Sequence, residues 1–326
     1  MYESHHKIRV GVLRGGPSSE YDISLKTGET VLRNLSRDMY IPHDIFISKE
    51  GVWHYDGFEK TPAEALKFVD VVFVALHGEY GEDGKVQAIL EHMKMPFVGS
   101  TSVESAVAMN KHLTKKMLRG MKYAKCASHK VVLKEEYSSE TAQDIFRTIP
   151  HPAIVKPVSL GSSVGIKIVR TFSDLEAALA EVFSLSEKVM VEEYIEGREA
   201  TCGIIDDFRN EKHYALPPVE IIPSNTFFDY EAKYGGASRE VCPSTFSHEI
   251  KKQIEDAARE AHAVLGLRHY SRSDFIVHPK RGVFYLETNT LPGLTSESLL
   301  PKEIYAVGGT LPQFLDHVIR LALGKR

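Results

Sequence analysis

The side chains best suited to chemistry lie in two strand-like stretches near the C-terminus, which a turn at residues 279–282 joins. A hairpin centred on this turn places Asp274 opposite Glu287. It also places Arg272 opposite Asn289. Opposed side chains share a face of a hairpin, and side chains alternate along each strand. The sequence therefore predicts one compact patch made of two carboxylates, an amide and a guanidinium.

Two carboxylates about 5 Å apart destabilise a hairpin, so we expect a cation between Asp274 and Glu287. Ligands that are all oxygen, with room for water or phosphate oxygens, favour magnesium over zinc. The alternative is a solvent-exposed face that carries ordinary charges, and a β-bulge could also shift the register. From the hairpin alone, both interpretations stay open.

A glycine- and serine-rich turn, residues 160–165, follows a predicted buried strand that ends with Lys156 and Pro157. The residues after this turn alternate with period two, which predicts a strand. A P-loop would instead open a helix and carry a lysine and a hydroxyl after its last glycine. A hairpin turn of this kind suits the covering of phosphates, whereas Lys156 taken alone could equally be a snorkelling side chain.

Other charged residues have a plain structural interpretation when each is taken alone. Lys111 lies on a predicted helix, where a solvated basic face with His112, Lys115 and Lys116 is the simpler interpretation. His77 could be a satisfied core histidine. The remaining candidates are carboxylates at a strand end and residues of a long, lid-like polar segment: Glu192, Glu193, Glu196, Glu199, Asp229, Tyr230, Glu231, Lys233 and Tyr234. Taken together, these features favour an ATP-using enzyme.

The elements that must position these residues alternate between strand and helix in the first part of the chain. Buried strands are predicted at residues 8–13 and 71–76, and a helix at about 23–35. This order predicts a parallel, doubly wound sheet whose ligand crevice lies at the C-terminal ends of its strands. We expect three domains: an N-terminal parallel α/β domain at 1–98, a central domain at 99–196, and a C-terminal domain with lid and metal site at 197–326.

The central part is expected to open with one long helix. Thr101 and Glu104 have the spacing of a capping box, and the helix is predicted to end before Gly120. Two later helices are predicted at about 248–265 and 311–323.

Composition limits the classes of protein that need to be considered. Of 326 residues, 43% are hydrophobic and 26% charged, which is typical of a globular protein, and the net charge of -4 gives no field to recruit nucleic acid. No apolar run approaches the roughly 18 residues of a membrane span, and the polar N-terminus does not predict a signal peptide. The three cysteines are far apart, which fits a reducing cytoplasm. Fifteen histidines show no ligand spacing outside His5 and His6, so the sequence does not predict a zinc site.

Five motifs carry a resemblance to a known family. They are residues 15–20 (GGPSSE), 77–84 (HGEYGEDG), 156–165 (KPVSLGSSVG), 228–234 (FDYEAKY) and 287–293 (ETNTLPG). Their order resembles that of D-alanine:D-alanine ligases, and the resemblance spans residues 8–323. It implies the ATP-grasp fold, in which a parallel-sheet domain precedes two α+β domains that hold ATP between them. It also implies ATP-dependent formation of D-alanyl-D-alanine through an acyl phosphate, for peptidoglycan precursor synthesis.

The resemblance further implies residue roles. The metal ligands would be Asp274, Glu287 and Asn289, holding two magnesium ions, with manganese able to substitute. The ATP-binding residues would be Lys111, Lys156, Ser162, Ser163, Glu192, Ile195 and Glu199. The catalytic residues would be Glu20, Ser162, Tyr234, Arg272 and Gly293, of which Arg272 and the Gly293 amide stabilise developing negative charge. The amino-acid substrates would meet His77, Lys233, Ser298 and Leu299.

Three departures from the family pattern affect helix capping, lid packing and burial of the hairpin face: Asn110, Phe228 and Ser273. Tyr234 favours a dipeptide product, because ester-forming relatives tend to carry phenylalanine there. The alternatives are a related ligase that makes D-alanyl-D-lactate or D-alanyl-D-serine, or a nucleotide-binding regulator without catalysis. A dinucleotide dehydrogenase is disfavoured because residues 14–19 lack the G-x-G-x-x-G spacing. The family also implies a cytoplasmic homodimer.

Overall fold

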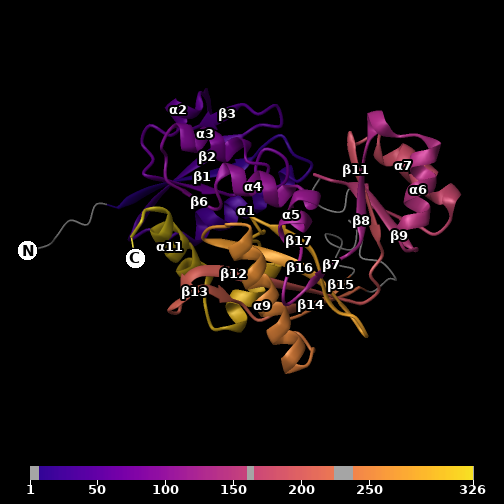
Figure 1. Cartoon of the computed structure of the whole chain (residues 1–326). Coiled ribbons are helices and arrows are strands. Elements are labelled where there is room, and N and C mark those ends of the chain that lie inside the picture. Colours follow the sequence, from indigo (N-terminus) through magenta and orange to yellow (C-terminus); the bar gives the residue numbers. More distant parts are fainter. Residues whose placement is uncertain (1–6, 160–164, 224–237, 326) are drawn as a thin grey trace, which may run out of the picture.

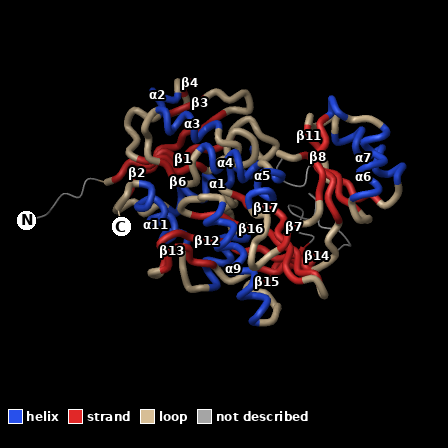
Figure 2. The backbone as a smooth tube through the Cα atoms, viewed as in Figure 1, coloured by secondary structure: helices blue, strands red, loops and turns tan. Residues whose placement is uncertain are grey.

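The computed structural model describes residues 7–159, 165–223 and 238–325, which form a mixed α/β structure with three sheets (Figures 1 and 2). The first sheet has the strand order β4-β3-β2-β1-β5-β6. Its strands are β1 (Ile8–Gly15), β2 (Tyr40–Ile47), β3 (Trp53–Tyr55), β4 (Phe58–Lys60), β5 (Val71–Val74) and β6 (Phe97–Val98). Its helices are α1 (Tyr21–Asn34), α2 (Pro62–Ala65) and α3 (Lys85–His92).

The parallel pairing expected for the first sheet is confirmed for β1, β2, β5 and β6. The edge strands β3 and β4 are antiparallel, which the sequence analysis did not predict. The loops after β1 and β5 lie at the C-terminal ends of the central strands. Both motifs expected at the ligand crevice, residues 15–20 and 77–84, therefore lie at the same edge of this sheet.

The second sheet is antiparallel, has the order β10-β9-β11-β8 and lies on the right in Figure 1. Its elements are β8 (His129–Leu133), η1 (Lys134–Glu136), α6 (Ser139–Thr148), β9 (Ala153–Pro157), β10 (Lys167–Val169), α7 (Phe172–Val182) and β11 (Lys188–Glu193). Helices α6 and α7 cover one face and enclose a separate hydrophobic core that includes Val155, Leu175 and Val191.

The third sheet has the order β15-β14-β12-β16-β17-β7, and β13 also pairs with β12. Its strands are β7 (Lys125–Cys126), β12 (Arg198–Phe208), β13 (Glu211–Ala215), β14 (Val219–Pro223), β15 (Ser238–Val241), β16 (Tyr270–His278) and β17 (Gly282–Asn289). The remaining helices are α4 (Ser102–Met109), α5 (Lys111–Met117), α9 (His248–Val264), α10 (Leu299–Ala306) and α11 (Leu311–Ala322).

The C-terminal helix α11 joins the first and third sheets into one hydrophobic core. Phe314 and Val318 of α11 are buried together with Val72 of the first sheet and Tyr270 of the third. The rings of Tyr270 and Phe314 pack edge to face with centroids 5.3 Å apart. The domain limits expected after residues 98 and 196 stay a prediction.

The helix expected from Thr101 to Gly120 is interrupted, so that part of the prediction was wrong. Asn110 separates α4 from α5, and its side-chain oxygen accepts a hydrogen bond from the amide of Leu113 at 3.0 Å. Thr101 precedes α4 but makes no side-chain cap. Asparagine is among the best N-cap residues, so the departure from the family pattern at this position still starts a helix. No helix of the described residues is long and apolar enough to cross a membrane.

Helix α1 carries Glu20 at its N-terminus and packs closely on β1. A Cβ atom added to Gly28 would lie only 2.5 Å from the Cβ of Arg14. That distance is shorter than side-chain carbons tolerate, and the contact involves the root of the arginine rather than its flexible end. Gly28 therefore sets the distance between α1 and β1, and with it the position of Glu20.

We predict that Gly28→Ala lowers the free energy of unfolding by about 1–3 kcal/mol, the usual cost of overpacking. Helix propensity alone would predict the opposite sign, a gain of about 1 kcal/mol. Urea unfolding measures the difference. The neighbouring Glu29→Ala, at an exposed position of the same helix, is the control and should change stability by no more than about 0.5 kcal/mol. A stabilised Gly28→Ala protein would contradict the packing argument.

Candidate active site

One cavity of about 1040 Å³ is lined by residues from all three sheets and their loops. Every described residue to which the family resemblance assigns a role lies in its wall, whereas the candidates Glu193 and Glu196 do not. The lining residues are Glu20, His77, Lys111, Lys156, Glu192, Ile195, Glu199, Arg272, Asp274, Glu287, Asn289, Gly293, Ser298 and Leu299. The other four, Ser162, Ser163, Lys233 and Tyr234, lie outside the described residues. Residues far apart in sequence thus meet around one space.

The β16–β17 hairpin has the predicted pairs, since Asp274 lies opposite Glu287 and Arg272 opposite Asn289. Two deviations from the predicted hairpin, a shorter loop and a β-bulge, cancel each other. The loop between the strands has three residues rather than four, because His278 pairs with Gly282.

A β-bulge then restores the register beside the paired carboxylates. Phe275 pairs with Tyr285 and Asp274 with Glu287, which leaves Leu286 as the extra residue. Leu286 and Glu287 both line the cavity. Bulges of this kind redirect side chains near functional sites.

Positive charges lie against both carboxylates of the hairpin. Arg272 donates to the two oxygens of Asp274, at 2.9 and 3.0 Å, and Lys111 Nζ lies 3.1 Å from Glu287 Oε2. Thr201 donates a further hydrogen bond to Asp274 at 2.7 Å. Although burial lowers the pKa of Arg272, the adjacent Asp274 raises it overall, so the guanidinium is always charged.

This patch is not a solvated face. The side chain of Asp274 is 15% exposed and that of Glu287 is 24% exposed, and both line the cavity. Two carboxylates and the Asn289 amide on neighbouring strands offer the oxygen ligands that Mg²⁺ prefers. The residues present therefore fit a magnesium site, and Arg272 and Lys111 lie against its carboxylates.

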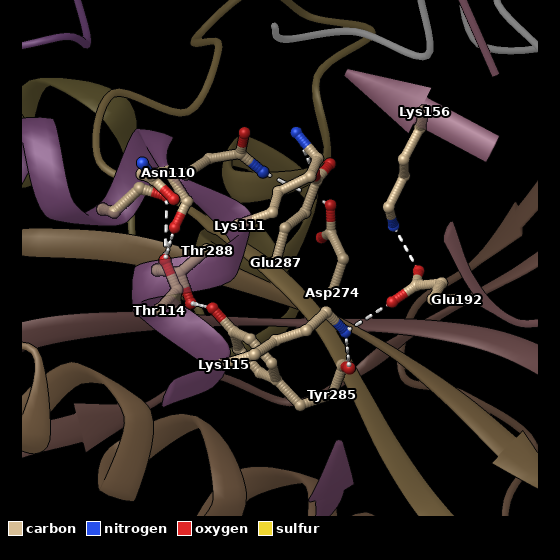
Figure 3. A network of polar contacts seen from close by, with 12 residues as sticks. Asn110, Lys111, Thr114, Lys115, Lys156, Glu192, Asp274, Tyr285, Glu287 and Thr288 are labelled. Atoms are coloured by element: carbon tan, nitrogen blue, oxygen red, sulfur yellow. Dashed lines mark hydrogen bonds and ion pairs between the residues drawn. The ribbon is translucent and has the colours of Figure 1, made fainter. Parts of the chain in front are cut away.

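The second sheet contributes a buried cluster of one carboxylate and two lysines (Figure 3). Glu192 of β11 is 2% exposed and pairs with Lys156 of the neighbouring strand β9 and with Lys115 of α5, whose Nζ lies 3.1 Å away. Burial alone would raise the pKa of Glu192, but the two lysines hold that pKa at about 2. Glu192 is therefore ionised and forms an ion pair with each of the two lysines.

Lys115 does not line the cavity, but it pairs with Glu192, which does, and the sequence analysis missed this role. The solvated basic face expected for this helix was wrong for Lys111 and Lys115, which are both buried, whereas Lys116 is exposed. Lys115 Nζ also donates to the backbone carbonyl of Tyr285 at 3.3 Å. The four-residue spacing of Lys111 and Lys115 was the available signal, since it places both on one helix face.

His77 lies at the cavity wall and is fully hydrogen-bonded. Its Nδ1 lies 3.0 Å from the carbonyl of Leu291, and its Nε2 lies 2.8 Å from the hydroxyl of Thr27. A carbonyl can only accept, so Nδ1 carries the proton and Nε2 accepts from Thr27. Burial lowers the pKa of His77, which favours this neutral form.

Glu82, in the same motif as His77, is a second residue that the sequence analysis did not single out. Its carboxylate accepts hydrogen bonds from the amides of Gly78, at 2.8 Å, and Leu291, at 3.3 Å. Burial and the nearby Glu20 raise its pKa to about 8. Glu82 thus ties the loop after β5 to the loop after β17.

The loop after β17 brings Gly293 against Ser298. A Cβ atom on Gly293 would lie 2.7 Å from Ser298 Oγ, so a larger residue here would have to displace the Ser298 hydroxyl. Ser298 Oγ also accepts from the amide of Thr295 at 3.1 Å. The Gly293 backbone and the Ser298 hydroxyl are therefore held at the same part of the cavity.

Lysines, an arginine and paired carboxylates that converge between a parallel-sheet unit and two further sheets define an ATP-grasp ligase. The family profile described as "D-ala D-ala ligase N-terminus" matches residues 9–65 and 56–100, and "D-ala D-ala ligase C-terminus" matches residues 81–320. The chain belongs to the D-alanine–D-alanine ligase family, whose members are ATP-dependent ligases that use Mg²⁺. The expected ATP-grasp fold is confirmed.

Relatives match over almost the full length of the chain. The D-alanine–D-alanine ligase of Desulfotalea psychrophila is 36% identical over 98% of this chain and 96% of its own length. That of Syntrophobacter fumaroxidans is 39% identical over 98% and 99%.

Two solved structures show the same agreement in three dimensions. The D-alanine–D-alanine ligase of Bacillus anthracis has a TM-score of 0.83 at 35% identity, covering 97% of this chain and 98% of its own. The VanG D-Ala:D-Ser ligase of Enterococcus faecalis has a TM-score of 0.84 at 29% identity, covering 97% and 100%.

We predict that Lys115→Met destabilises the protein by about 3 kcal/mol, because it leaves Glu192 with one lysine in a buried setting. Lys156 should then be drawn more strongly to Glu192, so the KM for ATP should rise severalfold. Urea unfolding and steady-state kinetics measure the two effects.

The matched control is Lys116→Met, which removes an exposed lysine one residue along the same helix. The double variant Lys115→Met with Glu192→Gln should recover part of the lost stability, because it removes the unbalanced charge as well. If Lys115→Met and Lys116→Met had the same stability and the same KM for ATP, the ion pair of Lys115 with Glu192 would contribute to neither property.

Proposed function

We propose that the chain, as a D-alanine–D-alanine ligase, phosphorylates the carboxylate of one D-alanine with ATP and lets the amine of a second attack the acyl phosphate. A carboxylate is a poor electrophile, so activation must precede amide formation. The single observation that carries this proposal is the cavity in which Asp274 and Glu287 lie among Arg272, Lys111 and Lys156. This is the charge arrangement needed to hold a polyphosphate and its metal beside a reacting carboxyl group.

We propose that Asp274, Glu287 and Asn289 hold two magnesium ions, for which manganese can substitute. When bound, these ions neutralise charge on the phosphates and on the transferring phosphoryl group. Their oxygen ligands lie on opposed strands of one hairpin, which supports the proposal. Arg272, which pairs with Asp274, would then also interact with the transferring phosphoryl group.

The phosphates of ATP would be bound by Lys111 and Lys156. Both lysines are now paired with carboxylates, Glu287 and Glu192, and phosphate oxygens would share these lysines. Glu192 would meet the adenine, and its ion pair with Lys156 would orient that lysine toward the phosphates. The backbone near Ile195 would meet the base and Glu199 the ribose, and both line the same cavity.

Ser162 and Ser163 would close over the phosphates, a proposal that rests on sequence alone. The same holds for Lys233 as a substrate contact and for Tyr234 in a hydrogen-bonded link with Glu20 and Ser162.

The first D-alanine would place its ammonium at Glu20 and its carboxylate near His77, whose Nδ1–H would have to leave the Leu291 carbonyl to donate to that carboxylate. The second would be bound by Ser298 and Leu299, through a hydroxyl–carboxylate contact and a methyl contact. The Gly293 amide and Arg272 would stabilise the oxyanion that forms during attack. The close approach of Gly293 to Ser298 supports a shared location for these two functions.

The product would supply peptidoglycan precursor synthesis. We further propose that the protein works in the cytoplasm and as a homodimer, as the resemblance to its family implies.

Asp274→Asn should reduce Mg²⁺-dependent turnover of ATP by at least a hundredfold, because it removes a charged ligand while keeping the shape of the side chain. Release of ADP in the presence of D-alanine measures the effect. Asp144→Asn, which alters an exposed carboxylate on α6, is the control and should retain full turnover. A near-normal rate for Asp274→Asn would rule out this metal assignment.

The second candidate function is a D-alanine:D-serine ligase, which the likeness to the VanG enzyme favours. We expect ATP consumption with D-alanine alone and D-alanyl-D-alanine as the main product. Mass spectrometry of mixtures with equal D-alanine, D-serine and D-lactate distinguishes the products, and L-alanine is the negative control. A mixed dipeptide or an ester as the main product would show that the second substrate is D-serine or D-lactate instead of D-alanine.

A further inference from the structure

A cluster of metal-ligating side chains lies in the third sheet, outside the active-site cavity. It contains Asp206 of β12, His213 of β13 and His262 of α9. None of the three lines the cavity that holds the predicted active-site residues. The cluster is therefore spatially separate from the predicted active site.

Three potential ligand atoms converge within this cluster. Asp206 Oδ1 lies 2.7 Å from His213 Nδ1 and 3.0 Å from His262 Nε2, and all three atoms lie within 4.8 Å of one another. Two imidazole nitrogens and one carboxylate oxygen form a common ligand set for zinc and for other first-row transition metals. The same set would not be selected for Mg²⁺, which prefers oxygen.

His262 supplies an independent observation. Its side chain is fully buried, and within the described residues its Nε2 has no hydrogen-bond partner of acceptable geometry, although it faces Asp206 Oδ1. This buried nitrogen is thus held by the 3.0 Å contact to the carboxylate, without the alignment of a hydrogen bond. A metal ion bound at Nε2 would satisfy this nitrogen.

The surrounding residues orient the ligands as the outer shell of a metal site does. His262 Nδ1 lies 2.7 Å from Ser271 Oγ, which leaves Nε2 to face the cluster. Asp206 Oδ2 accepts the backbone amide of His269 at 2.7 Å, which leaves Oδ1 toward the two imidazoles. Such contacts fix the orientation of ligands and are typical of protein metal sites.

We propose that Asp206, His213 and His262 bind one divalent transition-metal ion such as Zn²⁺. Metal bonds of about 2.0–2.1 Å place tetrahedral ligand atoms about 3.4 Å apart. The two contacts to Asp206 Oδ1 therefore open by about half an ångström. Asp206 and His213 are 18% and 21% exposed, so solvent reaches the site and supplies the fourth ligand.

Nearby positive charge does not exclude the ion. Arg259 approaches His213 through its backbone carbonyl, to which its Nε donates at 3.3 Å. Its guanidinium is paired with Asp256, at 2.8 Å, and Glu211, at 3.7 Å. The arginine charge is thus balanced by two carboxylates beside the site.

The bound ion would act as a structural brace. It would join β12, β13 and α9 at one point. A fourth element, α11, also contacts this point, because His317 Nε2 lies 2.7 Å from the backbone carbonyl of Asp206. On β12, Gly203 pairs with Arg272 three residues away from Asp206. The brace would therefore stabilise the sheet that carries the catalytic arginine, without contact to substrate.

The test uses the full chain, treated with a chelator and returned to buffer with excess Mg²⁺, which fills the oxygen-ligand site. Zn²⁺ alone is titrated by calorimetry, and Co²⁺ alone is titrated while the visible spectrum is recorded. We expect one high-affinity ion per chain, an intense tetrahedral Co²⁺ spectrum, and a rise of a few degrees in Tm with Zn²⁺.

His213→Ala should weaken Zn²⁺ binding at least tenfold and abolish the tetrahedral spectrum, and Asp206→Asn should do the same. His248→Ala, which removes an exposed histidine from the same helix as His262, is the matched control and should bind normally. Asp274→Asn should also bind normally, which separates this site from the catalytic metal site. Because every variant retains His5 and His6, binding at those residues cannot produce the expected difference.

Stoichiometric binding that survives both His213→Ala and Asp206→Asn would overturn the proposal, as would the absence of high-affinity binding to the unaltered chain. His213 is partly exposed, so His213→Ala should fold. Without metal, it should unfold in one cooperative transition, with a free energy of unfolding lowered by about 1–2 kcal/mol because the contact to Asp206 is lost.

Discussion

Carboxylates that lie close together in a half-buried cavity wall repel one another strongly, so cations must lie among them. The active site is built around this requirement for charge balance. Asp274 and Glu287 face each other across a hairpin, and Arg272 and Lys111 lie against them. On another wall of the cavity, Glu192 is fully buried between two lysines. Each carboxylate is therefore balanced before any ligand arrives. A polyphosphate and its metal would exchange partners with these groups, which costs less than creating the charge balance anew.

The same ion pairs connect parts of the structure that have separate hydrophobic cores. The second sheet is packed by α6 and α7 alone, whereas the first and third sheets share a core through α11. Lys115 belongs to α5, beside the third sheet, and Glu192 belongs to the second. The amide of Lys111 also donates to the carbonyl of Val158 at 3.0 Å. These polar contacts align the two walls of the cavity together with a small apolar cluster of Ala127, Ile195 and Phe284.

The agreement between the predicted and observed hairpin depends on a cancellation. The loop is one residue shorter than predicted, and the bulge at Leu286 adds one residue, so Asp274 still meets Glu287. Neither deviation has a strong sequence signal, because bulges depend on twist and cross-strand packing. The solvated face expected for Lys111 and Lys115 was wrong for a related reason. The spacing of lysines on a helix does not reveal that Lys115 pairs with the buried carboxylate of Glu192, which lies 77 residues further along the chain.

Local chemistry along the chain was sufficient to predict the central parallel strands of the first sheet, the existence of the β16–β17 hairpin and the ordered motifs of the ligase family. These features depend on periodicity, turn residues and spacing, which act over a few residues. Tertiary structure alone decided that α11 completes the first core, that Lys115 balances Glu192, and that Asp206 meets His213 and His262. Such contacts join residues distant in sequence, and burial determines their strength, so no local pattern contains them.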